Sequence, residues 1–190
     1  PAISDPGEDL VRLCVENGVE VRAIPGCCAA VNALAISGLP TGRFTFEGFL
    51  TVNKKSRREH LDSLKDETRT MIFHEAPHKL RTTLNDLTEA FGPDRRISLC
   101  REITKLHEEV IRCTLAEAVA YYEENSPKGE YVLVVAGAAP KTGAAVTLED
   151  GVAQVLALKE QGMRLKDAAK EVAEHTGLSK NELYAAALDR

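Results

Sequence analysis

Apolar residues recur along the chain with two kinds of spacing, which predict helices and strands in turn. Apolar residues three or four positions apart predict helices, and alternating or continuous apolar runs predict strands. The predicted helices are 5–17, 27–38, 53–67, 77–91 and 115–125. The predicted strands are 19–26, 42–50, 69–73, 95–103, 108–114 and 129–137. Strands that alternate with helices predict an α/β fold with a largely parallel or mixed sheet and helices packed on it.

The pattern changes after the last predicted strand. Small residues at 138–146 are typical of a linker. The tail then contains three predicted helices, at 147–163, 164–177 and 178–190. Their apolar spacing is typical of a helix-turn-helix or of a small helical cap. The last helix carries Lys180 and Arg190 against Glu182 and Asp189, which is too little positive charge for duplex DNA binding on its own.

The stretch MIFHEAPHKL, residues 71–80, contains the H-E-x-x-H pattern of zinc proteases. That pattern binds zinc only on a helix, where His74 and His78 would lie on one face. In a helix interior, however, Pro77 would lose a hydrogen bond and clash with the preceding turn, at a cost of about 3 kcal/mol. We therefore predict that Pro77 begins the helix 77–91 and that no metal is bound. A junction between strand and helix is a common ligand site in α/β folds.

The composition narrows the class of protein. The chain has 190 residues, of which 44% are hydrophobic and 28% charged, as expected of one or two globular domains. Its net charge of −5 argues against strong non-specific attraction to nucleic acid. No apolar run is long enough to cross a bilayer, so we expect a cytoplasmic protein without membrane contact. The five cysteines are expected to be reduced, because adjacent Cys27 and Cys28 are badly placed for a disulfide.

Three turns between predicted elements gather small and polar residues, at 3–7, 25–30 and 73–78. The second begins a helix, so its free backbone N–H groups are suited to an anionic or polar ligand. Its small residues are equally consistent with a tightly packed turn. A charged stretch at 100–110 is either a solvated loop or a substrate-facing edge, with Arg101 and Lys105 as phosphate contacts.

Taken in order, these segments resemble the ribosomal RNA small subunit methyltransferase I family, within the tetrapyrrole-methylase-like, S-adenosylmethionine-dependent enzymes. The resemblance covers nearly all of residues 1–137, through ISDPGEDLV, IPGCCAAVNALAISGLPTGRFTFEGFL, KKSRREHL, RTMIFHEAPHKL, CREITKLHEEV and KGEYVLVVAG. The tail 147–190 is similar to the family's C-terminal helix-turn-helix segment. The resemblance implies a two-domain α/β/α fold that clasps S-adenosylmethionine, and 2′-O-methylation of a cytidine of 16S ribosomal RNA.

The resemblance also implies a division of the chain. Residues 1–42 would be the remnant of an N-terminal α/β domain, and 43–137 a complete C-terminal α/β methyltransferase domain. The linker 138–146 and the helical tail 147–190 would follow. The family's opening strands and its D-A-G-T-P loop do not occur in this sequence. We therefore expect the chain to be part of a longer protein and to be inactive alone. The implied partners are 16S ribosomal RNA within the small ribosomal subunit and a second copy of the chain.

For the cofactor, the resemblance implies a cleft lined by backbone and side-chain groups from several turns. The expected cofactor-binding residues are Ser4, Cys28, Ala29, Phe73, Glu75, Pro77, Gly129 and Glu130. Two segments depart from the family pattern. The usual P-G-P-S-A reads PGCCA at 25–29, and the usual Y-E-S-P-H-R reads HEAPHK at 74–79. Both departures keep the backbone groups but remove hydroxyl or guanidinium side chains.

The acceptor side is expected to carry the chemistry. A methyl transfer is an in-line displacement, so alignment of the acceptor with the methyl group is the main task. A ribose hydroxyl also needs a base or a polarising cation nearby. We predict Glu75, Arg101 and Lys105 as catalytic residues, without naming the base. The predicted contacts to the RNA backbone are Lys54, Lys55, Arg57 and Arg58.

Two other functions stay open at this point. The same fold serves enzymes that methylate small tetrapyrrole-like molecules, and the C-terminal helices alone suit a non-enzymatic nucleic-acid-binding module. The basic cluster at 54–58 and the helical tail favour RNA over a small molecule.

Overall fold

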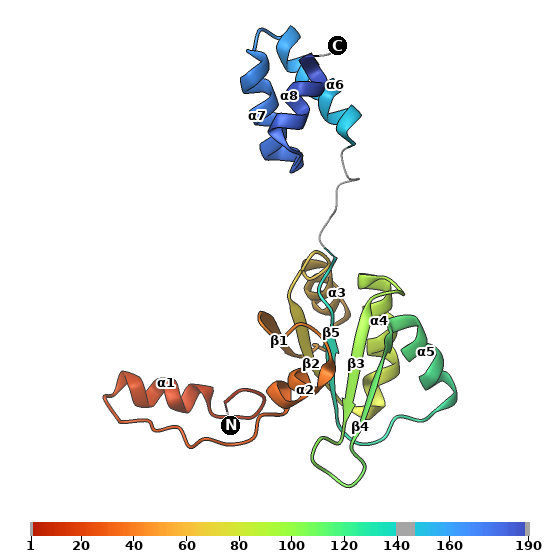
Figure 1. Cartoon of the computed structure of the whole chain (residues 1–190). Helices are drawn as coiled ribbons and strands as arrows, with labels where there is room; N and C mark the ends of the chain where they lie inside the picture. Colours follow the sequence, from red (N-terminus) through yellow and green to blue (C-terminus); the bar gives the residue numbers. More distant parts are fainter. Residues whose placement is uncertain (1, 140–146, 189–190) are drawn as a thin grey trace. The chain divides into compact units, whose positions relative to one another are not determined.

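The computed structural model describes residues 2–139 and 147–188 and divides into two compact units, Pro1–Ala139 and Pro140–Arg190 (Figure 1). Among these described residues, the first unit contains a sheet covered by helices, and the second contains three helices and no strand. Most of the predicted linker 138–146 and the last two residues of the predicted helix 178–190 lie outside the described residues.

The first unit is built on a five-stranded sheet with the order β1-β2-β5-β3-β4. Its strands are β1 Phe44–Phe49, β2 Thr70–Glu75, β3 Arg96–Arg101, β4 Glu109–Thr114 and β5 Tyr131–Val135. Only β1 and β2 run parallel, and the other neighbouring pairs are antiparallel. The sheet is therefore mixed, as one of the two predicted alternatives. The central strand β5 is buried along its whole length, as its continuous apolar run predicts.

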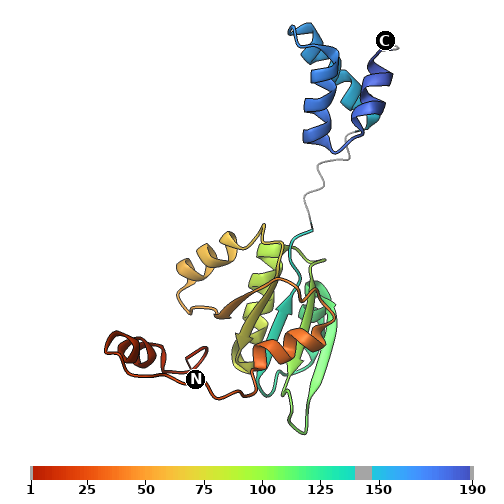
Figure 2. The same ribbon diagram turned by 60° about the vertical axis from the view of Figure 1, so that its left-hand side comes forward.

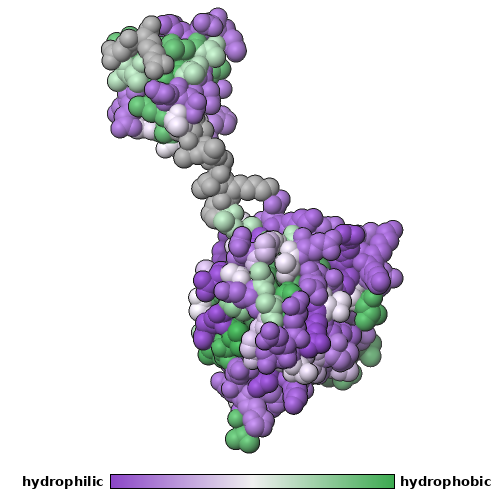
Figure 3. Space-filling model, turned by 90° about the vertical axis from the view of Figure 1, so that its right-hand side faces the viewer, coloured by the Kyte–Doolittle hydropathy of each residue, from purple (hydrophilic) through white to green (hydrophobic). Residues whose placement is uncertain are grey.

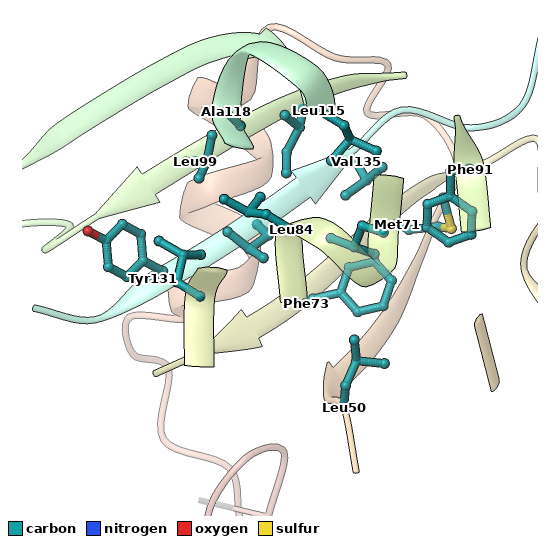
Figure 4. Packing of buried hydrophobic residues seen from close by; sticks show 14 of the residues in the cluster. Leu50, Met71, Phe73, Leu84, Phe91, Leu99, Leu115, Ala118, Tyr131 and Val135 are labelled. Atoms are coloured by element: carbon teal, nitrogen blue, oxygen red, sulfur yellow. The ribbon is translucent and has the colours of Figure 1, made fainter. Parts of the chain in front are cut away.

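Helices cover both faces of this sheet (Figures 1 and 2). One face packs against α3 Lys54–Ser63, α4 Leu80–Phe91 and α5 Leu115–Glu124, and the other face packs against α2 Ala29–Ser37. Alternation along β2 assigns Met71 and Phe73 to the first face and Ile72 to the second. Figure 4 shows Phe73, Leu84 and Leu99 filling the larger core under α4 and α5. The first unit is therefore an α/β/α sandwich.

The start of the chain differs from the prediction. Helix α1, Glu8–Glu16, forms as expected but buries none of its residues. The predicted strand 19–26 is wrong, because these residues have no regular secondary structure and are exposed. A strand needs a neighbour to receive its backbone hydrogen bonds. Within the described ranges, every strand pairing of the sheet involves β1 to β5 and leaves 19–26 without a partner.

The junction at Pro77 has the predicted form. Strand β2 ends at Glu75, Ala76 is extended, and Pro77 begins a single 3₁₀ turn, Pro77–Lys79, that leads into α4. The prediction that Pro77 starts a helix is confirmed. His74 therefore lies on a strand and His78 on the 3₁₀ turn, so the two imidazoles lack the helical spacing of a zinc protease.

The second unit is a three-helix cluster with its own core. Its helices are α6 Leu148–Glu160, α7 Leu165–Thr176 and α8 Lys180–Leu188. Gly177 ends α7 in the left-handed conformation, where glycine carries no steric cost. The core of this unit contains Val152, Val155, Ala168, Ala169, Val172, Leu183 and Ala187. The three predicted tail helices are thus confirmed.

Hydrophilic residues cover most of the face of the first unit that Figure 3 displays, with hydrophobic ones in small separate patches. Among the residues that the structure describes, no helix combines the length and the apolar character needed to cross a bilayer.

Candidate functional site

Register places the ends of several strands side by side. Glu75 at the end of β2 is opposite Tyr131 at the start of β5, and Tyr131 is opposite Arg101 at the end of β3. Arg101 in turn is opposite Glu109 at the start of β4. We call this row the Glu75 end of the sheet. It brings together three segments predicted to be functional, namely 73–77, Gly129 with Glu130, and 101–105.

Helix α2 points its N-terminus toward the Glu75 end. Its C-terminal end is held at the opposite end of the sheet, where Arg112 Nε donates to the carbonyl of Ser37 at 3.1 Å. The Thr70 hydroxyl, at the start of β2, donates to the carbonyl of Pro40 at 2.7 Å. At the other end of α2, Cys28 is the N-cap residue but its side chain makes no capping hydrogen bond. The first N–H groups of α2 therefore remain available to an anionic ligand.

The predicted residue Ser4 reaches the Glu75 end through a histidine that the sequence prediction missed. The Ser4 hydroxyl lies 3.1 Å from Nδ1 of His74. His74 is half-buried, stands edge-on to the rings of Phe46 and Phe49, and has no hydrogen-bond partner for its buried Nε2 among the described residues. An imidazole nitrogen that is buried without a partner is costly unless a ligand satisfies it. Its place within the family's Y-E-S-P-H-R segment was the available signal.

Burial lowers the pKa of the His74 imidazole, and the nearby charge of Asp5 partly opposes this effect. In the folded protein the ring therefore remains neutral at pH values where an unfolded histidine, with a pKa of about 6.5, takes up a proton. Because the unfolded chain then binds more protons, the free energy of unfolding falls as the pH drops below about 6.5.

Replacement of His74 by phenylalanine is expected to flatten this pH dependence. Urea unfolding at neutral and mildly acidic pH measures it, and the His74→Phe variant should lose less stability on acidification than the unchanged chain. The control His107→Gln, in the exposed loop between β3 and β4, should keep the original slope. An equal slope for His74→Phe and the unchanged chain would contradict the assignment.

Two predicted cofactor residues face away from α2. Phe73 is fully buried under α4 and Glu75 is only 4% exposed. Alternation along β2 places their side chains on the face opposite to His74. They can approach a ligand on the α2 side only through backbone groups, whereas Pro77 lies beyond the strand, at the start of the 3₁₀ turn.

The carboxylate of Glu75 belongs to a hydrogen-bonded network that joins three elements. Its Oε1 accepts from the N–H of Ala76 at 2.8 Å, and its Oε2 accepts from the hydroxyl of Thr83 on α4. Arg57 of α3 donates from Nη2 to the same Thr83 oxygen at 2.8 Å and pairs through Nε with Asp86 at 2.6 Å. Both oxygens of Glu75 are thus already engaged. This geometry favours a role for Glu75 in positioning the turn after β2.

A second cluster of charged side chains, Glu102, Lys105 and Glu130, lies beside Gly129 at the Glu75 end. Lys105 Nζ lies 3.0 Å from both Glu102 Oε1 and Glu130 Oε2. These carboxylates raise the pKa of Lys105, which keeps its ammonium charged. A Cβ atom on Gly129, which has a φ of +80°, would lie 2.5 Å from the Glu102 side chain, so this position requires glycine. Arg101 pairs with Glu109 at 3.3 Å. The predicted catalytic cations are therefore close to the sheet end but already compensated by carboxylates.

The four predicted RNA-binding residues lie in the first half of α3 in different environments. Lys54 and Lys55 are exposed, and Lys55 is 3.9 Å from Glu59. Arg58 forms an exposed ion pair with Glu89 of α4. The side chain of Arg57 is only 12% exposed and is tied to Asp86 and Thr83. Among the described residues, no group of His, Cys, Asp and Glu has the arrangement of a metal site.

Comparison with known proteins shows which family this chain resembles. Residues 1–119 match the tetrapyrrole (corrin/porphyrin) methylases, and residues 146–190 match the RsmI C-terminal HTH domain. The chain is 44% identical over 189 residues to the ribosomal RNA small subunit methyltransferase I of Synechocystis sp., which covers 100% of this chain and 68% of that protein. It is 41% identical to the Escherichia coli O157:H7 protein of the same name, over 100% of this chain and 66% of that protein.

Solved structures agree on the fold. The methyltransferase CobJ superposes with a TM-score of 0.51 at 25% identity, over 70% of this chain and 57% of that one. A uroporphyrin-III-C-methyltransferase from Thermus thermophilus superposes with a TM-score of 0.51 at 20% identity, over 72% and 60% of the two chains. The chain spans about two thirds of the length of the curated relatives that it matches. With identities above 40% across its whole length, it belongs to the ribosomal RNA small subunit methyltransferase I family of tetrapyrrole-methylase-fold enzymes.

Proposed function

We propose that this chain takes part in S-adenosylmethionine-dependent 2′-O-methylation of a cytidine ribose in 16S ribosomal RNA. One observation carries the proposal: the uncapped N-terminus of α2, Ser4 and the unsatisfied Nε2 of His74 all lie toward the Glu75 end of the sheet. The family supplies the methyltransferase class, and these groups supply a place for its cofactor.

The residues present fit S-adenosylmethionine. The backbone N–H groups at Cys28 and Ala29 suit the carboxylate of its methionine part, because helix N-termini favour anions. His74 offers a neutral imidazole nitrogen for a polar group of the ligand. When bound, the cofactor supplies an electrophilic methyl group on a sulfonium. The chain's own residues would hold the donor in place, with the rings of Phe46 and Phe49 packed edge-on against His74.

On the acceptor side the structure supports cations more than a base. Lys105 stays protonated between Glu102 and Glu130, so we assign it to polarising the ribose hydroxyl or binding the adjacent phosphate. Arg101, at the end of β3, would assist at the same place. Glu75 would hold the turn that follows β2, since both of its oxygens already accept hydrogen bonds.

The biological setting is part of the same proposal. The names of the relatives point to ribosomal RNA as substrate. Because the net charge is −5, we expect recognition of assembled small-subunit structure in the cytoplasm rather than bulk attraction to RNA. A homodimer, usual for the family, stays a prediction.

Methylation of a tetrapyrrole-like molecule is the competing function. The likeness to CobJ and to uroporphyrin-III-C-methyltransferase concerns the fold. The match of residues 146–190 to the RsmI C-terminal HTH domain favours RNA, because the relatives that match the whole chain are named as ribosomal RNA methyltransferases. A purely nucleic-acid-binding role for the tail is opposed by the composition of α8, whose first turn holds the acidic Glu182 as well as Lys180.

A methyl-transfer assay tests the proposal. Small ribosomal subunits and a porphyrinogen are offered with radiolabelled S-adenosylmethionine to this chain and to a version extended upstream by the family's opening segment. We expect cofactor binding and label in a 2′-O-methylcytidine for the extended chain, and weak or no binding for the 190-residue chain. Label in the porphyrinogen, or equal tight cofactor binding by both chains, would contradict it.

A further inference from the structure

A groove between α3 and α4 lies outside the expected cofactor cleft, on the opposite face of the sheet from α2. Its volume is about 660 Å³, which is within the range of ligand-binding clefts. It begins where β1 and β2 end, beside Thr51, Val52 and His78. It continues along the two helices toward Lys65 and Ala90.

Cationic side chains line both walls of this groove. Lys54, Arg58 and Lys65 come from α3 and the residues just after it, and Lys79 comes from the 3₁₀ turn before α4. Asp62 and Glu89 compensate Lys65 and Arg58 in exposed ion pairs. Such exposed pairs contribute only about 0–1 kcal/mol, so a competing anion can replace the carboxylate at little cost.

Two of the lining cations are uncompensated. Among the ion pairs between described residues, none involves Lys54 or Lys79. The two residues flank the groove from different elements, α3 and the 3₁₀ turn. The lining also includes the apolar side chains of Val52 and Leu61. Separated positive charges together with apolar side chains suit an elongated polyanion that carries planar, partly apolar groups.

The floor of the groove is connected to the Glu75 end. Arg57 lines the groove and, through the hydroxyl of Thr83, reaches the carboxylate of Glu75 at the end of β2. Asp86, also in the lining, holds the other side of the same guanidinium at 2.6 Å. A ligand in the groove would therefore lie against a hydrogen-bonded network that ends at the turn beside the candidate site.

We propose that the α3–α4 groove binds the phosphodiester backbone of the RNA substrate, with Lys54 and Lys79 as its principal phosphate contacts. The proposal rests on the proposed function and deepens it. It also changes the set of predicted RNA contacts. Lys65 and Lys79 line the groove and are added, whereas Lys55 does not line it. Arg57 is bound to Asp86 in the network beneath the groove.

The test compares two variants that lose the same charge. In Lys54→Gln/Lys79→Gln both uncompensated groove cations are neutralised. The control Arg43→Gln/Arg81→Gln neutralises two exposed cations of the same unit. Neither of these residues lines the groove. Fluorescence anisotropy measures the affinity of each chain for a fluorescein-labelled single-stranded oligocytidylate. The oligonucleotide has about 12 nucleotides, which is long enough to fill one groove of this kind. The salt concentration is varied between about 50 and 200 mM.

Each phosphate contact on single-stranded nucleic acid contributes a slope of about 0.7 to the dependence of log affinity on log salt. Lys54→Gln/Lys79→Gln should therefore reduce the slope by about 1.4 and weaken binding about 25-fold near 0.1 M salt. The Arg43→Gln/Arg81→Gln chain should keep at least half of the original affinity. Matching urea unfolding curves for both variants would show that the fold is intact.

Three results of the binding assay would overturn the proposal: equal losses in the two variants, no RNA binding by the unchanged chain, or displacement of the RNA by polyglutamate at equal charge concentration. The last would indicate an acidic protein partner. A separate readout keeps the proposed function distinct. If the upstream-extended chain methylates small subunits equally well with and without Lys54→Gln/Lys79→Gln, the groove proposal fails and the proposed function stands. If it methylates no RNA while the groove variants behave as expected, the proposed function alone fails.

Discussion

Replacement of Gly137 by alanine is expected to lower the free energy of unfolding of residues 1–139 by about 3 kcal/mol, at the upper end of the usual cost of overpacking. A Cβ atom at this position would lie 2.0 Å from the carbonyl oxygen of Thr68 and 2.8 Å from that of Arg69. Both are backbone atoms, which cannot move aside as a flexible side chain can. The chain after β5 would have to leave the segment before β2 and lose the 2.6 Å hydrogen bond from Ala138 N–H to the Glu67 carbonyl.

Urea unfolding measured by circular dichroism gives the size of the effect. Gly42→Ala is the matched control, since a Cβ there would meet nothing within 4 Å. It should change stability by less than about 1 kcal/mol, in the stabilising direction if the unfolded chain loses entropy. A Gly137→Ala chain as stable as Gly42→Ala would show that residues 67–69 and 137–138 are not in contact in solution.

Replacement of Glu75 by alanine is expected to cost a similar amount, about 3 kcal/mol. The change leaves the Ala76 N–H and the Thr83 hydroxyl without the buried acceptor that both now use. It also removes the carboxylate that the Thr83 hydroxyl links to Arg57, so that Asp86 is the one carboxylate left in this network of described residues. Urea unfolding measures the loss, and the 3₁₀ turn that begins at Pro77 should become more open to hydrogen exchange.

The conservative variant Glu75→Gln separates structure from catalysis. Its amide oxygen can still accept from Ala76, so its loss of stability should be about 1 kcal/mol. If Glu75 only positions the turn, the upstream-extended Glu75→Gln chain should methylate small subunits at a rate near that of the unchanged chain. A drop of a hundredfold or more with an intact fold would restore Glu75 as a proton acceptor, because general-base catalysis is worth about 10²–10⁴.

Elements whose partners lie within the described unit were predictable from the sequence. The continuous apolar run 129–137 became the buried centre of the sheet, and Pro77 started a helix as its fixed φ requires. The predicted strand 19–26 is wrong because it has no partner strand within the described residues. Alternating apolar residues create a strand only when a neighbouring strand takes up the backbone groups, and periodicity alone does not reveal whether one is present.

The sequence predicts which turns meet but not which side chains they present. The turns at 73–77 and 101–105 lie beside each other because register aligns the ends of their strands, while their role in binding stays a prediction. The face of the sheet to which a side chain points changes with a shift of one residue along the strand. Strand boundaries predicted from the sequence are not accurate to one residue, so they do not fix that face. In the structure His74 lies on the α2 side of the sheet, whereas the predicted Glu75 lies on the opposite side. Ion pairs between distant residues, such as Arg57 with Asp86, are not visible in local patterns at all.

The contact between Arg112 and α2 affects the position of the N-terminus of that helix. This residue of the outermost strand β4 fastens the last turn of α2 through the carbonyls of Ile36 and Ser37. A helix of nine residues is about 13 Å long, so a tilt of only about 5° about that anchor would shift Cys28 by about 1 Å. Misplacement on this scale is enough to slow a displacement reaction about a hundredfold. The accuracy with which the donor is aimed would then be set at the far rim of the sheet, by a guanidinium that touches neither reactant.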